Sequence, residues 1–226
     1  MFGKSRNSIK SNQVKPNLLS LEQRDVPAAI TVQHVQFGDG TANRSDVFQV
    51  KITLDTAVPT TTTNLGTGAE YDPITLHQRG GGQAYNTEYV TMNVSLDSTR
   101  KVITLSGFSG ELADTNSSLV NGYYDLLINA AQVYSGADSI NGQYDTAGSG
   151  ADYYAIGNKG TQASKNNFFR LYGDTDGDGV VAQPDFISFR NAFGLSGPST
   201  WDHDGNGVVD TADFVYFRNI YGWQVL

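Results

Sequence analysis

Two stretches near the C-terminus decide how this sequence is interpreted. Residues 174–180 read Asp-Thr-Asp-Gly-Asp-Gly-Val, and residues 202–208 read Asp-His-Asp-Gly-Asn-Gly-Val. Each is followed at the same distance by Asp-Phe and then by Phe-Arg-Asn. The two copies are offset by 28 residues, and the match extends to a closing glycine, Gly194 or Gly222. This regularity predicts two copies of one structural unit.

Each copy has the spacing of a calcium-binding loop. Ca²⁺ takes about six to eight oxygens, and such a loop supplies side-chain oxygens at positions 1, 3 and 5, a backbone carbonyl at position 7 and a carboxylate at position 12. Glycine at position 6 permits the turn. The predicted ligands of the first ion are Asp174, Asp176, Asp178, the Val180 carbonyl and Asp185. Those of the second ion are Asp202, Asp204, Asn206, the Val208 carbonyl, Asp210 at the water-mediated position 9, and Asp213.

Asp-Gly runs also occur as plain acidic turns. Here each copy places four carboxylates in one loop, and their mutual repulsion favours a neutralising cation. The duplication therefore favours two bound Ca²⁺ ions over two plain turns.

An aromatic face follows each loop. The spacing i, i+3 and i+7 places three aromatic side chains on one face of each predicted helix, and Gly194 and Gly222 occupy the C-cap positions. These side chains are Phe186, Phe189 and Phe193 in one helix, and Phe214, Phe217 and Tyr221 in the other. We expect the two helices to bury these faces against each other.

No full helix precedes either loop. Residues 165–172 offer at most two turns, and residues 195–201 contain Gly197 and Pro198. A calcium loop with only its exiting helix, duplicated once, resembles the dockerin type I family over about residues 168–223. The resemblance implies a small module that docks onto a cohesin domain, often on polysaccharide-degrading enzymes. The positions of the Ser/Thr pair common in that family hold Gln183-Pro184 and Thr211-Ala212 here.

Residues 28–160 carry a β pattern. Apolar and polar residues alternate over residues 48–54 and 90–96, apolar residues recur at Tyr124, Leu126 and Ile128, and residues 30–36 begin the set. Residues 102–106 are the expected hairpin partner of residues 90–96. Strands at this spacing predict an antiparallel sandwich. The stretch, above all residues 122–128 and 130–133, resembles bacterial Ig-like domains of surface and S-layer-type proteins. Residues 144–154 and 158–167 are interpreted as a linker.

The N-terminal 27 residues are basic, with five lysines and arginines among the first 25 residues. They contain neither an ordinary signal peptide nor a membrane-spanning run. Residues 21–28, Leu-Glu-Gln-Arg-Asp-Val-Pro-Ala, resemble a Leu-Glu-x-Arg-x-x-Pro-Ala stretch near the start of dockerin-ended envelope and secreted proteins. That resemblance implies export or sorting, while the residues alone fit a flexible basic tail equally well.

Composition excludes several classes of function. The chain has no cysteine, so it has no disulfide, no thiolate metal site and no cysteine nucleophile. The net charge of −8 argues against a nucleic-acid partner. The three histidines are scattered without a catalytic pattern, and the spacing of the glutamates does not support a glycosidase pair.

We therefore expect a multidomain, mainly β protein: a basic leader (1–27), an Ig-like β-sandwich (28–160) and an α-helical, dockerin-like calcium module (161–226). The expected function is calcium binding in a non-catalytic secreted or cell-surface protein, where two Ca²⁺ ions order the module. The expected partner is a cohesin-like domain or a cell-envelope component. The alternatives are a cohesin-docking adaptor whose sandwich binds carbohydrate, and a small polysaccharide-degrading enzyme.

Overall fold

The structure is a computed structural model, and it describes residues 32–60, 64–79, 85–129, 133, 144–145, 152–156 and 168–225. The predicted leader and its Leu-Glu-x-Arg-x-x-Pro-Ala stretch lie outside the described residues, as do residues 158–167 of the expected linker.

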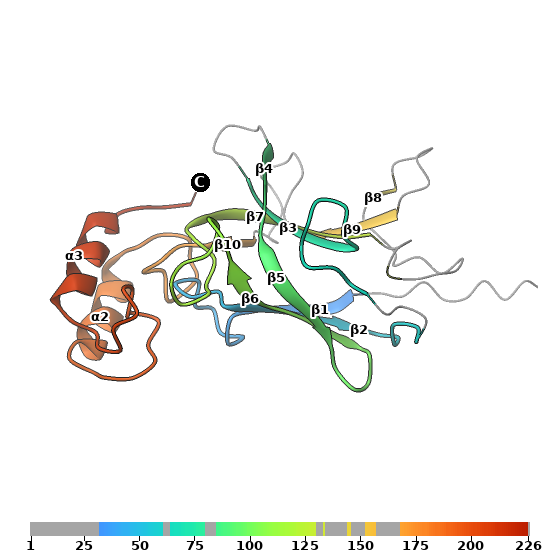
Figure 1. Ribbon diagram of the computed structural model, residues 1–226. Coiled ribbons are helices and arrows are strands. Elements are labelled where there is room, and N and C mark those ends of the chain that lie inside the picture. The colour runs from blue at the N-terminus through green and yellow to red at the C-terminus, as the bar shows by residue number, and fades with distance from the viewer. Residues whose placement is uncertain are drawn as a thin grey trace, which may run out of the picture.

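The described residues form two antiparallel sheets (Figure 1). The first has the strand order β1-β2-β6-β5, and the second has the order β4-β3-β7-β9-β8, with β10 also paired to β7. The strands of the first sheet are β1 (Val32–Phe37), β2 (Gln49–Leu54), β5 (Thr91–Leu96) and β6 (Val102–Ser109). Those of the second are β3 (Ile74–Arg79), β4 (Tyr85–Tyr89), β7 (Gly122–Asn129), β8 (Tyr144–Asp145), β9 (Asp152–Ile156) and β10 (Phe168–Arg170).

Alternation along the strands builds one core between the two sheets. In β2, Val50 and Ile52 are fully buried and Lys51 between them is half-buried. In β7, Leu126 and Ile128 are fully buried and Leu127 between them is half-buried. Residues of both sheets belong to the same hydrophobic cluster. The prediction of a mainly β, two-sheet fold is confirmed.

The predicted hairpin is also confirmed. β5 pairs with β6, and Leu96 lies opposite Ile103. The turn between them is held by Asp97, whose side chain accepts hydrogen bonds from the Lys101 and Val102 amides at 2.9 Å. The turn is stabilised by hydrogen bonds between residues at most five positions apart, and for this reason the local sequence was enough to predict it.

The linker expected over residues 144–154 is wrong in part. β8 and the start of β9 lie within it, and β9 pairs with β7 in the second sheet. Residues 165–172 likewise contain a strand, β10, whose Phe168 lies opposite Tyr124 of β7. Pairing with β7 decided the structure of both segments, because an open sheet edge can recruit residues that have only a weak strand pattern of their own.

Two helices follow, α2 (Gln183–Ala192) and α3 (Thr211–Ile220), and Figure 1 shows them together beyond one end of the sandwich. Their buried residues form a second hydrophobic cluster with Tyr172, Val181, Trp201 and Val209. The predicted glycine caps are present, since Gly194 and Gly222 have φ of 84° and 87°. Only the middle aromatic of each predicted face is fully buried. Phe189 and Phe217 are each 1% exposed, whereas Phe193 and Tyr221 are each 49% exposed.

Candidate metal centre

The first acidic loop gathers three of its predicted ligands. Asp174, Asp176 and Asp185 each offer a carboxylate oxygen, and these oxygens lie within 4.8 Å of one another. Asp174 and Asp185 are fully buried, and Asp176 is exposed. The ligands at loop positions 1 and 12 therefore lie on the buried side of the group, and the ligand at position 3 lies on the solvent side. A cation could enter the group from the solvent side.

The second loop repeats this arrangement 28 residues later. Asp202, Asp204 and Asp213 bring their oxygens within the same distance, and the burial pattern is again buried, exposed, buried. The repetition matters because an accidental acidic turn has no reason to recur with the same burial at equivalent positions.

The other predicted side-chain ligands lie in the same loops, where they accept hydrogen bonds from backbone amides. The side chains of Asp178 and Asn206, at position 5, are exposed and accept hydrogen bonds from the amides of Val180 and Val208, both at 2.8 Å. Asp178 is not part of the first carboxylate group. Asp210 is the N-cap of α3, where it accepts a hydrogen bond from the Ala212 amide at 2.7 Å.

Backbone amides shape each loop around its carboxylates. Asp174 accepts hydrogen bonds from the amides of Gly177 (2.7 Å) and Gly179 (2.9 Å), and Asp185 accepts from Thr175 (2.8 Å) and Ala182 (2.9 Å). A carboxylate has about four lone-pair sites, so each of these groups keeps acceptor capacity for a cation.

The second loop makes the equivalent bonds. Asp202 accepts from Gly207 at 2.8 Å, and Asp213 accepts from His203 at 2.7 Å and from Asp210 at 2.8 Å. The position-6 glycines, Gly179 and Gly207, both have φ of 86°, a conformation that L side chains rarely adopt. The sequence-based reason for glycine at these two positions is therefore confirmed.

The clustered charge perturbs Asp174. Burial raises the pKa of its carboxyl to about 6, and the neighbouring carboxylates of Asp185 and Asp178 act in the same direction, while the bonds from Gly179 and Gly177 oppose the shift. A buried acid whose charge is disfavoured by other acids is a group that a divalent cation would stabilise in its ionised form.

Each loop is joined to the end of the other repeat's helix. Val181, position 8 of loop one, donates to the Trp223 carbonyl at 2.9 Å and accepts from the Gly222 amide at 2.8 Å. Val209, position 8 of loop two, donates to the Leu195 carbonyl at 3.0 Å and accepts from the Gly194 amide at 2.8 Å. The residues that follow α3 are hydrogen-bonded to loop one, and those that follow α2 are hydrogen-bonded to loop two. Backbone hydrogen bonds therefore couple each loop to the other repeat.

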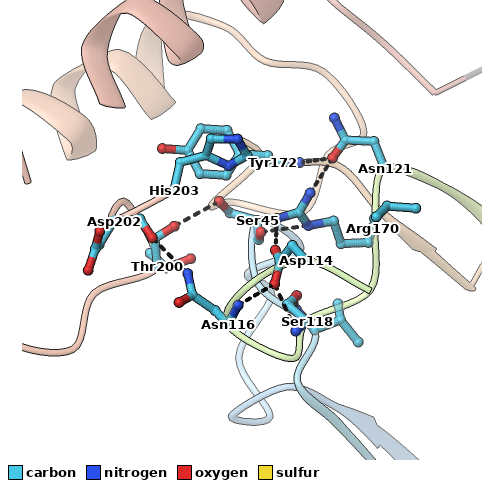
Figure 2. Close-up of polar contacts among 12 residues, drawn as sticks. Ser45, Asp114, Asn116, Ser118, Asn121, Arg170, Tyr172, Thr200, Asp202 and His203 are labelled. Atoms are coloured by element: carbon cyan, nitrogen blue, oxygen red, sulfur yellow. Dashed lines mark hydrogen bonds and ion pairs between the residues drawn. The ribbon is translucent and has the colours of Figure 1, made fainter. Parts of the chain in front are cut away.

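Sequence reasoning missed the residues that attach these loops to the sandwich. Arg170 is 3% exposed and forms an ion pair with Asp114 at 3.0 Å, across 56 positions of sequence. Asn116 donates from Nδ2 to the backbone carbonyl of Asp202 at 2.8 Å (Figure 2). No local pattern marks these residues, because their partners lie 56 and 86 positions away in the sequence.

No family model and no curated protein matches the chain. Among solved structures it is similar to the S-layer protein rSbsC, at 14% identity and a TM-score of 0.27 over 44% of this chain. It is also similar to domains 1–6 of the surface layer protein SbsC, at 14% identity and a TM-score of 0.30 over 57% of this chain. The chain spans 11% and 13% of those two chains. Likenesses this weak carry no argument about the fold or function of this chain.

Within the part of the chain that the structure describes, each helix is too short or too polar to cross a lipid bilayer.

Proposed function

We propose that this protein binds two Ca²⁺ ions in its two acidic loops and that the ions order the helical unit of residues 171–225. The observation that carries the proposal is the repeated group of three carboxylates, each with two buried members and one exposed member. Oxygen ligands are those that Ca²⁺ prefers, and the chain has no cysteine with which to bind softer metals.

The role of calcium in this proposal is structural. Ion binding converts four like-charged side chains per loop into ligands, so it contributes free energy to the folding of loops and helices together. The ligands at positions 5, 7 and 9, including Asp178, Asn206 and Asp210, would complete the coordination shell beyond the three carboxylates. The protein is non-catalytic in this proposal.

Calorimetric titration of the full chain with CaCl₂ tests the proposal. The expected stoichiometry is two, and Asp174→Asn combined with Asp202→Asn removes both binding events. The matched control is Asp55→Asn, which changes one exposed aspartate that follows β2 and lies outside both groups. The absence of calcium binding by the wild-type chain would refute the proposed function.

A second candidate function is docking to another protein, in the manner of the dockerin family. The observation that favours it is a set of exposed apolar side chains on and after the two helices. They are Phe186, Ile187, Phe193, Leu195, Val215, Tyr221 and Trp223, each 38–59% exposed. The corresponding partner would be a cohesin-like domain or a cell-envelope component. Capture of a purified cohesin by the calcium-loaded chain but not by a Tyr221→Ser variant would support it, and equal capture by both would not.

The proposed location is the cell surface or the extracellular medium. Calcium loops of the weaker, extracellular type have dissociation constants of about 10⁻⁴–10⁻³ M and would stay empty in the cytosol. The Leu-Glu-x-Arg-x-x-Pro-Ala stretch supports the same proposal. Fractionation of the native host decides it, since recovery only from the cytoplasm would contradict export. Binding of the sandwich to a glycan array tests the carbohydrate-binding alternative, and a polysaccharide hydrolysis assay tests the enzyme alternative.

A further inference from the structure

The sandwich contacts both acidic loops at equivalent positions. The backbone carbonyl of Asp174, position 1 of loop one, accepts a hydrogen bond from the Arg44 amide at 2.8 Å. The backbone carbonyl of Asp202, position 1 of loop two, accepts from Asn116 Nδ2, also at 2.8 Å. Two different sandwich loops, 38–48 and 110–121, therefore bind the same atom of the two repeats.

A second pair of contacts repeats in the same way. Position 4 of each loop is a glycine that packs against the sandwich. A Cβ atom on Gly177 would clash with the Ala42 carbonyl oxygen, and one on Gly205 would lie 3.0 Å from Asn116 Oδ1. Each sandwich loop thus lies against one corner of an acidic loop, between positions 1 and 4.

A buried arginine connects these two contacts. Arg170 donates from Nε to the Ser45 carbonyl at 2.9 Å and from Nη2 to Asp114 at 3.0 Å (Figure 2). Asp114 in turn accepts from the Asn116 amide at 2.9 Å and so holds the turn that presents Asn116. A continuous set of hydrogen bonds therefore runs from Arg170, four residues before loop one, through the sandwich to loop two.

From this geometry we infer that the sandwich loops are part of the proposed calcium sites and that calcium controls how firmly the helical unit is docked on the sandwich. Asn116 is a positioning residue: it binds the backbone of Asp202, whose side chain is a predicted ligand. The inference rests on the proposed function and adds its regulation. Asp174 and Asp202 each present a side chain to the ion and a carbonyl to the sandwich, so any reorganisation of the loop on ion loss displaces a docking contact.

Thermodynamic linkage makes the effect reciprocal. If calcium strengthens docking by some factor, docking must strengthen calcium binding by the same factor. A substitution on the sandwich side that removes no ligand oxygen must then weaken calcium binding, and removal of calcium must loosen the interface.

Spin-label distance measurement tests the effect of calcium on docking. The chain has no cysteine, so Ser98→Cys on an exposed sandwich turn and Asn219→Cys on the exposed side of α3 give a uniquely labelled pair. The expected result is a single narrow distance distribution with calcium and a broader one with chelator. If calorimetry shows two bound ions and the distribution is the same in both conditions, the inference is wrong while the proposed function stands.

Asn116→Ala tests the reciprocal effect. Loss of one hydrogen bond predicts about two- to tenfold weaker calcium binding in the titration, and a smaller rise in Tm on adding calcium. The control is Asn64→Ala, which removes an exposed asparagine that accepts from the Gly66 amide within its own loop. Both variants should lose similar stability in chelator. Equal calcium affinity in Asn116→Ala, Asn64→Ala and the wild type would overturn the inference.

Discussion

Phe189 of α2 and Phe217 of α3 stack with their ring centroids 5.1 Å apart and an interplanar angle of 11°. They are equivalent residues of the two repeats, and each is 1% exposed. Trp201 meets both rings edge-on, at 5.2 and 5.5 Å. The two repeats therefore share one aromatic core, with the acidic loops at its edges.

The shared core predicts a large effect of Phe189→Ala. Truncating a fully buried phenylalanine should reduce the free energy of unfolding by about 3–5 kcal/mol. Phe186→Ala on the same helix is the control, because its side chain is 38% exposed and its loss should cost far less. Urea denaturation of both variants checks the difference, and similar losses would contradict a core centred on Phe189.

The shared core also predicts coupling between the two ions. Asp174→Ala should abolish binding in loop one, weaken binding in loop two and lower the helicity of the whole unit, because each loop is bonded to the end of the other repeat's helix. Calorimetry and circular dichroism check this. Loss of one ion with the other affinity unchanged would contradict the coupling.

Residues after α3 should matter more to loop one than to loop two. Val181 and Gly179 of loop one are bonded to residues 222–225, whereas loop two is bonded to Gly194 and Leu195. A chain ending at Tyr221 should therefore bind the first ion several-fold more weakly. The control is a chain ending at Val225, which keeps these bonds. An equal loss at both sites in the shorter chain would show that the segment does not act on loop one specifically.

The raised pKa of Asp174 predicts two opposite effects of acid. Calcium needs the ionised carboxylate, so calcium affinity should fall as the pH drops through about 6. Without calcium, acid has the opposite effect, because it then acts on the stability of the folded chain. A carboxyl with a raised folded-state pKa contributes stability that is present below the unfolded value, near 3.8, and is lost as the pH rises through about 6.

Thermal unfolding between pH 4 and pH 6.5, with calcium and with chelator, checks both predicted effects of acid. In chelator the chain should become more stable on acidification within this window, with Asp46 adding to the effect because burial also raises its pKa. With saturating calcium it should become less stable. Two groups oppose the trend: His203, whose pKa is lowered by burial, acts within the window, and Asp97, whose pKa is lowered to about 2, acts mainly below it. The chelator effect should shrink in Asp174→Asn.

The Arg170–Asp114 pair should behave as a buried ion pair. Arg170→Met leaves the carboxylate of Asp114 without its partner and should cost about 3–5 kcal/mol of unfolding free energy. Adding Asp114→Asn removes the remaining charge and keeps an oxygen that can accept from the Asn116 and Ser118 amides. The double variant should recover part of the loss in urea denaturation. Additive losses would contradict a direct interaction.

Local chemistry determined what could be predicted from the sequence. The acidic loops, their position-6 glycines and the glycine-capped helices depend on residues within about 12 positions of one another. The same holds for the alternating strands and for the hairpin at Asp97. These features were predicted with the right residues because their spacing reflects the geometry of a single turn, helix or strand.

Tertiary structure decided the rest. The contact of Asn116 with Asp202 spans 86 positions, and that of Arg170 with Asp114 spans 56. Pairing with β7 made strands of β9 and β10, where the sequence had suggested linker or helical turn. Such contacts depend on which strands become neighbours in the sheets. The alternation of apolar and polar residues along a strand shows only which face is buried, so it does not predict these contacts. The sequence by itself therefore determined the two acidic loops and their helices, and only the packed sheets determined that the sandwich holds both loops by the same backbone atom.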